Sequence, residues 1–214
     1  MKKTAILLSA MLTSTTALAA VPIAGWYASA FVGAAYLPDN VNTTVNGLYY
    51  NNSKYNMGYD VGASLGYKSG NLRYEIEGTY IKAKPDQFNI NGVSQTGVNG
   101  HSTAVSGMAN VYVDFEGFIT SVIQPYLGAG TGYAYVKNEL SASGPTIATS
   151  VKNSNTVFAY QGMAGVTYNF AENYAATLGY RYLGTDSTRY WGKRFQAHMG
   201  NVSVIYRFDE AEYK

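Results

Sequence analysis

A two-residue alternation of side-chain character recurs along this 214-residue chain, and it is the feature that most limits the possible folds. Successive side chains of a β-strand point to opposite faces, so such alternation is typical of strands that separate an apolar environment from a polar one. No segment shows the period of an amphipathic helix. The alternation predicts an all-β fold with strands at about residues 26–36, 59–67, 72–81, 103–115, 123–136, 156–170, 174–183 and 197–208.

The connections between these segments fall into two classes. Those after the second, fourth and sixth segments are short, whereas those after the first, third, fifth and seventh are long and rich in Asn, Ser, Thr and Gly. Short turns at one end and long loops at the other are typical of outer-membrane barrels, whose long loops face outward. We therefore expect one domain over residues 20–214, an eight-stranded antiparallel up-and-down transmembrane β-barrel in which residues 209–214 form a periplasmic tail.

Alternation alone would also fit a soluble barrel with its apolar face inward, so the character of the two faces matters. Aromatic residues stand at both ends of one face, as with Tyr59 and Tyr67 or Tyr74 and Tyr80. Eight residues at about 3.3 Å each, tilted by roughly 40°, span on the order of 20 Å, close to the apolar band between two interfacial girdles. The opposite face mixes charges with glycine, which leaves room for bulky neighbours inside a narrow barrel. Lipid should therefore meet the aromatic face, and the sheet must close because lipid cannot satisfy backbone polar groups.

The N-terminus predicts export. Lys2 and Lys3 precede a short apolar core and the small-residue site Ala17-Leu-Ala19, so residues 1–19 are expected to be a cleaved signal peptide. No other apolar run approaches the roughly 20 residues that a spanning helix needs. The chain has no cysteine, which excludes a disulfide framework and thiolate chemistry. Its net charge of only +2 argues against a nucleic-acid partner.

A set of charged residues falls on the face expected to point into the barrel. Burying lone charges is costly, and an eight-stranded barrel is just wide enough for side chains to fill it. We therefore expect these residues to pair as a structural network, with an ion path through the lumen as the alternative. The predicted network comprises Asp60, Arg73, Glu75, Glu77, Asp114, Arg181 and Arg207.

No motif indicates catalysis, a cofactor or a metal. His101 and Ser102 are adjacent, which is poor geometry for a nucleophile and its base. Two isolated histidines without cysteine do not make a metal site. The glycines of Gly128-Ala-Gly-Thr-Gly132 recur every second residue within a strand, unlike those of a nucleotide-binding loop. We therefore expect a protein that is not an enzyme and that binds no cofactor.

Aromatic and basic residues in the first and last long connections suggest a binding surface. Such side chains are the usual anchors of interfaces, and Lys and Arg could meet phosphates of lipopolysaccharide or acidic host glycans. Alternatively, Tyr190 and Trp191 anchor the chain at the membrane interface while the basic residues lie against lipid headgroups. The candidate contacts are Tyr49, Tyr50, Tyr55, Arg189, Tyr190, Trp191, Lys193 and Arg194.

Several stretches resemble strand motifs of small eight-stranded outer-membrane proteins: the opacity-type surface antigens, often labelled the porin family, and more distantly the OmpX-like proteins. These stretches are Leu72-Arg-Tyr-Glu-Ile-Glu-Gly78, Met108-Ala-Asn-Val-Tyr-Val-Asp-Phe115, Gln124-Pro-Tyr-Leu-Gly-Ala-Gly130, Phe158-Ala-Tyr-Gln161 and Leu178-Gly-Tyr-Arg-Tyr182. The resemblance covers the strands and none of the loops. It implies a non-enzymatic surface protein that acts in adhesion, host interaction or envelope integrity through its extracellular loops. A narrow channel for small solutes or ions is the alternative.

The last expected strand resembles the insertion signal that such proteins present to the barrel assembly machinery. The residues that carry this resemblance are Asn201, Ser203, Tyr206 and Phe208. Two positions depart from the usual pattern, because Ser203 stands where the signal has Gly and Phe208 is followed by residues 209–214. We expect the machinery to be a partner of this chain, together with outer-membrane lipid, lipopolysaccharide and a host-surface ligand.

Overall fold

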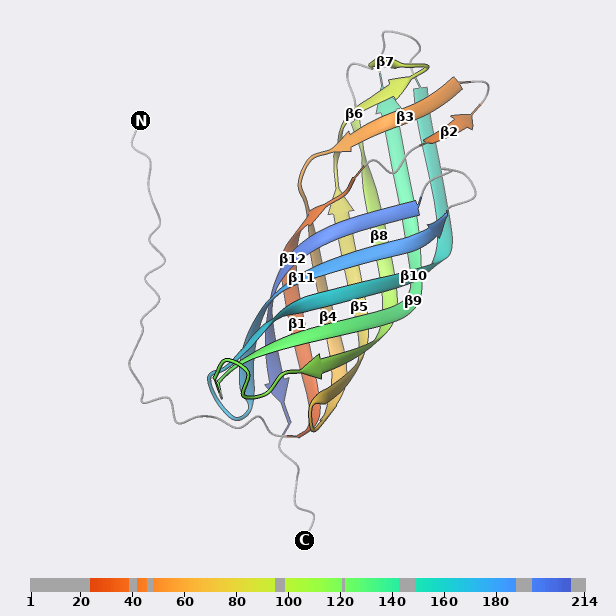
Figure 1. Ribbon diagram of the computed structural model, residues 1–214. Coiled ribbons are helices and arrows are strands. Elements are labelled where there is room, and N and C mark those ends of the chain that lie inside the picture. The colour runs from red at the N-terminus through yellow and green to blue at the C-terminus, as the bar shows by residue number, and fades with distance from the viewer. Residues whose placement is uncertain are drawn as a thin grey trace, which may run out of the picture.

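The barrel is closed and antiparallel, as predicted. The computed structural model describes residues 24–38, 42–45, 48–94, 99–120, 122–142, 149–187 and 194–208, so the expected signal peptide and the tail after Phe208 lie outside it. Eight strands follow one another around the barrel in the order β1-β12-β11-β10-β9-β8-β5-β4 (Figure 1). Their bounds are Gly25–Tyr36 (β1), Gly58–Ser69 (β4), Leu72–Ala83 (β5), Asn99–Asp114 (β8), Ile123–Ala142 (β9), Thr149–Asn169 (β10), Tyr174–Ser187 (β11) and Arg194–Arg207 (β12).

The first and last strands of the barrel complete the closure. β12 pairs with β1 along its length, with Tyr27 opposite Arg207 and Tyr36 opposite His198, while the other edge of β1 pairs with β4. All neighbouring strands of the barrel run antiparallel. Among the described residues, no helix is long and apolar enough to cross a membrane.

β9 and β10 extend far beyond the barrel wall at the end away from the termini (Figure 1), and β8 accompanies β9 as far as Asn99 opposite Ser141. Their pairing continues to Ala142 opposite Thr149, beyond the segments 123–136 and 156–170 expected from the sequence. The added residues are mostly polar in sequence, with Leu140 opposite Val151 as an exception, so alternation of apolar and polar residues does not mark them as strand. Backbone pairing extends the strands where the sequence pattern ends.

A second sheet stands beyond the barrel at the same end, in the connections that the sequence predicts only as loops. It contains β2 (Asn42–Val45), β3 (Leu48–Tyr55), β6 (Pro85–Ile90) and β7 (Val93–Ser94) in the order β2-β3-β6-β7 (Figure 1). The turn between β6 and β7 is Asn91-Gly92, with φ of 50° and 81°. Asn-Gly is the preferred pair for a two-residue hairpin turn because both positions need positive φ. Asn91-Gly92 is therefore a hairpin signal that can be recognised in the sequence alone.

The two faces of the barrel wall differ as the alternation predicts. In β5, Arg73, Glu75, Glu77 and Thr79 are buried, while the side chains between them face outward and are largely exposed. Aromatic pairs mark the ends of the outward face. Trp26–Tyr67 and Tyr174–Tyr206 lie near the termini, with ring centroids 5.5 and 5.0 Å apart, and Tyr133–Phe158 and Tyr160–Tyr182 lie toward the loops.

Candidate functional site

Side chains fill the barrel interior in layers, and the layer nearest the termini is an ion-pair cluster. Asp114 on β8 accepts hydrogen bonds from Lys68 Nζ at 2.8 Å and from Arg73 Nε at 2.9 Å. Glu75 lies 3.4 Å from the Arg73 guanidinium and accepts a 2.6 Å hydrogen bond from the hydroxyl of Tyr27. Buried charges therefore join three neighbouring strands, β4, β5 and β8, on the inner face of the wall.

A second layer crosses the middle of the lumen around Glu77. Its carboxylate pairs with Arg181 from β11 and accepts hydrogen bonds from Thr79 Oγ1 at 2.7 Å and Asn110 Nδ2 at 3.1 Å. Gln161 from β10 donates to Asn110 Oδ1 at 2.7 Å. The layer thus ties β5, β8, β10 and β11 together.

Two members of the predicted network lie apart from these layers. Asp60 accepts a hydrogen bond from Asn201 Nδ2. Arg207 lies at the terminal end of the lumen, where it donates to Asn169 Oδ1 at 2.6 Å and to the carbonyl of Glu172 at 3.3 Å. The structure therefore brings five of the seven network residues into two clusters, and each of the other two has a neutral partner.

Aromatic rings also occupy the lumen, and the sequence analysis did not single out their role. The Arg73 guanidinium lies 4.6 Å from the Tyr112 ring centroid and 5.3 Å from that of Tyr126, while Arg181 lies 4.4 Å from Phe31. A guanidinium over a ring gains cation–π stabilisation, which grows when both groups are desolvated.

Inward glycines make room for these rings. A Cβ on Gly62 would collide with Phe31, one on Gly66 with Tyr27, and one on Gly128 with Tyr112. From the sequence, the glycines were expected to make room for bulky neighbours such as Arg and Glu. At these three positions aromatic rings occupy the space, and two of these rings stack on arginines.

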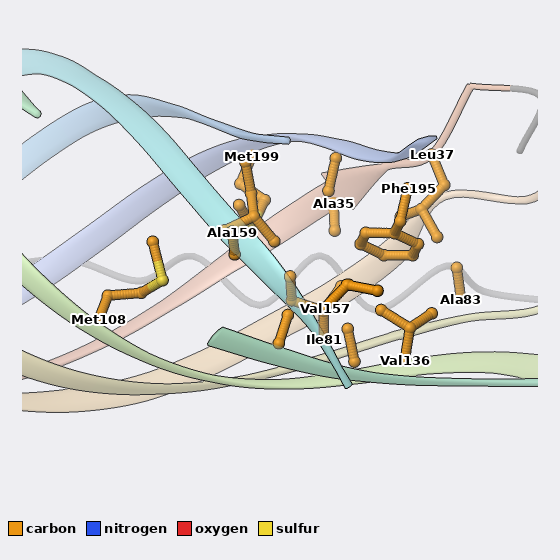
Figure 2. Packing of buried hydrophobic residues seen from close by; sticks show 14 residues of the cluster. Ala35, Leu37, Ile81, Ala83, Met108, Val136, Val157, Ala159, Phe195 and Met199 are labelled. Atoms are coloured by element: carbon orange, nitrogen blue, oxygen red, sulfur yellow. The ribbon is translucent and has the colours of Figure 1, made fainter. Parts of the chain in front are cut away.

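At the loop end, the lumen is apolar rather than charged. A cluster that we call the apolar plug packs there between the strands (Figure 2). The change of character is visible along one face of β5, where Glu77 and Thr79 are followed by Ile81 and Ala83. The plug comprises Ala35, Leu37, Ile81, Ala83, Ala104, Met108, Ala134, Val136, Val157, Ala159, Leu183, Phe195, Ala197 and Met199.

Side chains leave little free space around the two ionic layers. A cavity of about 40 Å³ remains there, lined in part by Arg73, Tyr112 and Arg181. Arg73 Nη2 and Arg181 Nε have no hydrogen-bond partner among protein atoms. A polar cavity of this size holds a few water molecules, which would satisfy such donors. Within the described part of the chain, buried side chains therefore fill most of the barrel interior.

We expect the wild-type protein to give no discrete conductance steps in planar lipid bilayers. Ions would have to cross a dehydrated apolar layer and then displace buried ion pairs, and both steps are costly. The measurement is single-channel recording of wild type beside Arg181→Ala and Phe195→Ala. A wild-type conductance that changes in Arg181→Ala would contradict the packed lumen and revive the channel alternative.

The candidate loop contacts are divided between described and undescribed residues. Tyr49, Tyr50 and Tyr55 belong to β3, where their backbone positions pair with Thr44, Thr43 and Pro85, respectively. Arg194 is exposed at the first position of β12. Arg189, Tyr190, Trp191 and Lys193 lie outside the described residues.

The predicted insertion signal lies on the strand that closes the barrel. Tyr206 and Phe208 are exposed on the lipid-facing side with their ring centroids 5.3 Å apart. Asn201 is buried, and Ser203 is half-buried beside Thr177. Recognition of this strand by the assembly machinery stays a prediction.

Within the described ranges, no group of three or more His, Asp or Glu side chains could hold a metal ion. His198 faces outward, where its Nδ1 lies 2.6 Å from the hydroxyl of Tyr180. It therefore belongs to the outer aromatic surface and not to the lumen.

Comparisons with known proteins agree with this architecture. The family described as outer membrane protein beta-barrel domain matches residues 5–208. Opacity protein opA65 of Neisseria gonorrhoeae is 28% identical over 135 residues, which cover 50% of this chain and 54% of that protein. An uncharacterised protein of Brucella abortus is 34% identical over 100 residues, which cover 44% of this chain and 34% of that protein. The chain thus spans about half or less of the length of these curated relatives.

Among solved structures, Neisserial surface protein A has a similar fold. Its crystal structure matches with a TM-score of 0.56 at 19% sequence identity, over 86% of this chain and 97% of that one. At this identity the likeness concerns the fold alone.

Proposed function

Because the chain belongs to the family of outer membrane protein β-barrel domains and is an outer-membrane protein, we propose that it is a non-enzymatic surface protein that attaches to an external ligand. The barrel is the membrane anchor in this proposal. Recognition belongs to the β structure that stands above it. The family match also bears out the resemblance to opacity-type surface antigens.

The observation that carries this proposal is the contrast between the two ends of the molecule. The end with the termini closes in short turns, whereas the opposite end carries the sheet β2-β3-β6-β7 and the extended β9–β10 hairpin (Figure 1). Because the β structure beyond the membrane is already ordered, binding a ligand there costs little further conformational entropy. A packed lumen beneath it favours attachment over transport.

The ligand chemistry we propose follows from the residues that the outer connections carry. Tyr49, Tyr50 and Tyr55 on β3 supply flat amphipathic side chains, and Arg194 supplies a cation beside the last connection. Aromatic and Arg side chains dominate the binding energy of most interfaces. An acidic glycan or a protein surface with anionic groups fits this set best.

We expect a non-adherent laboratory bacterium that displays this protein to attach to cultured host cells. Replacing residues 39–57 by a short turn removes β2 and β3 and should reduce attachment on the order of tenfold, because the aromatic anchors are lost. The measurement is the number of bound bacteria per host cell at equal surface display.

Two controls make this experiment decisive. A variant with all the outer connections shortened tests whether any other outer segment binds, and the electrophoretic shift on heating shows that each barrel is folded. If the wild-type bacteria attach no better than bacteria with an empty outer membrane, attachment to those cells is ruled out and envelope support becomes the leading function.

A further inference from the structure

The outer wall of the barrel carries two lysines that flank a threonine across adjacent strands. Lys82 on β5 lies opposite Thr103 on β8, and Thr103 lies opposite Lys137 on β9. All three side chains are half-buried and fall on the outward parity, and the Thr103 hydroxyl donates to the Lys137 carbonyl at 3.4 Å. Adjacent strands lie about 4.8 Å apart, so the Cα atoms of the two lysines are separated by roughly 10 Å. Two flexible ammonium groups at this spacing can bracket one phosphate.

The height of these residues places them at the outer membrane boundary. Lys82 and Lys137 each follow a lipid-facing leucine, Leu72 and Leu127, by ten positions on the same face of the strand. Ten residues at about 3.3 Å, tilted by roughly 40°, rise about 25 Å, which is the height of the apolar band of such barrels. Exposed tyrosines lie immediately below them, as expected at an interfacial girdle. The lysines therefore lie where headgroups of the outer leaflet carry their phosphates.

A hollow in the lipid-facing wall lies below the two lysines, separated from them by the Tyr80–Val105 pair. It has a volume of about 690 Å³, and its outward lining includes Ala63, Leu65, Ile76 and Ala109. Gly78 and Gly107 form its floor opposite each other, each four positions from the Lys82–Thr103 pair. A Cβ at either glycine would meet nothing within 4 Å, so the space is open to the bilayer. An apolar hollow of this kind accommodates hydrocarbon.

We propose that this part of the wall is a binding site for a phosphorylated glycolipid of the outer leaflet. Lys82 and Lys137 hold its headgroup phosphate, and one of its acyl chains fills the hollow over Gly78 and Gly107. A lipid is favoured over a second copy of this chain because the cationic pair lies on the loop side of the hollow, which matches an anionic headgroup on an apolar tail. Lys84 is exposed and adds a third cation, Asp86 is exposed farther toward the loops, and Glu139 stands opposite His101 and Lys152 in the strand register.

The test is native mass spectrometry of the purified barrel in detergent with bisphosphorylated lipid A. Dephosphorylated lipid A with the same acyl chains and inorganic phosphate serve as the comparison ligands. We expect the wild type to retain one phosphorylated lipid about tenfold more tightly than the dephosphorylated one, as charge-assisted hydrogen bonds to a phosphate would give. Lys82→Gln with Lys137→Gln should abolish that difference, and Lys82→Arg with Lys137→Arg should keep it.

The hollow is tested separately with a matched pair of glycine variants. Gly78→Leu with Gly107→Leu fills it and should weaken binding of both lipids. Gly162→Leu with Gly200→Leu, on β10 and β12, adds the same bulk to open outward positions elsewhere on the wall and should change nothing. Heat-dependent electrophoretic mobility verifies folding of every variant.

Three results would overturn the proposal. Equal retention of both lipids would show that the hollow takes hydrocarbon without regard to the headgroup. Displacement of the lipid by millimolar inorganic phosphate would show a site for free phosphate. If the wild type forms dimers without bound lipid, and if Gly78→Leu with Gly107→Leu makes these dimers separate, the hollow is an interface between two copies of the chain. None of these outcomes bears on attachment through the outer connections.

Discussion

Arg181→Met should lower the free energy of unfolding of the barrel by about 3–5 kcal/mol, because it leaves the buried Glu77 carboxylate without its cation. Glu77 would retain only neutral hydrogen-bond donors such as Thr79 Oγ1 and Asn110 Nδ2. The substitution also removes the guanidinium that lies over the Phe31 ring. The measurement is urea unfolding of the barrel in lipid vesicles, followed by tryptophan fluorescence.

The double variant Glu77→Gln with Arg181→Met separates the loss of pairing from the loss of packing. Removing both charges leaves no buried ion, so we expect it to recover at least about half of the destabilisation of Arg181→Met. A cost of less than about 1 kcal/mol for Arg181→Met alone would indicate that water screens the pair. The lumen would then be wetter than a packed core, and the channel alternative would gain support.

These two outcomes connect stability to function, because the same contacts that hold the barrel together also close it. Glu77 and Arg181 are joined across the lumen, and the apolar plug fills the lumen toward the loop end. Because such packing fills the barrel interior, the outer surface is the part of the protein that can recognise a ligand. The proposed attachment and the proposed lipid site both use that outer surface.

The sequence was sufficient to predict the strands and their faces, because alternation is a local property of each strand. Tyr74 and Glu75 are neighbours in the chain and lie on opposite sides of the wall, and no long-range contact is needed to infer this. Which residues meet inside is a different matter. Arg181 reaches Glu77 from a strand more than one hundred positions away, so their contact depends on the register of every strand between them.

The parts that the sequence analysis did not anticipate have a common physical origin. The inward face was expected to mix charges with glycine, whereas Ile81 and Ala83 continue the face of Glu77 and Thr79 as part of an apolar plug. The sequences of β2 and β3, NTTV and LYYNNSKY, have no regular alternation of apolar and polar residues to reveal them. Only Asn91-Gly92 carried a local signal of the second sheet.

Gly62→Val should prevent stable folding or cost more than about 3 kcal/mol, whereas Gly78→Val should be nearly neutral, although both glycines lie in the middle of adjacent paired strands. A Cβ on Gly62 would collide with the Phe31 ring and lie 2.5 Å from the Gly78 carbonyl oxygen, and a backbone atom cannot easily move away. A Cβ on Gly78 meets nothing within 4 Å, and a β-branched residue suits an exposed strand position in lipid. The measurement is the folded fraction in lipid vesicles by electrophoretic shift, followed by urea unfolding. Equal effects at the two positions would contradict the assignment of the inner and outer faces, on which the packed lumen and the outer lipid site both depend.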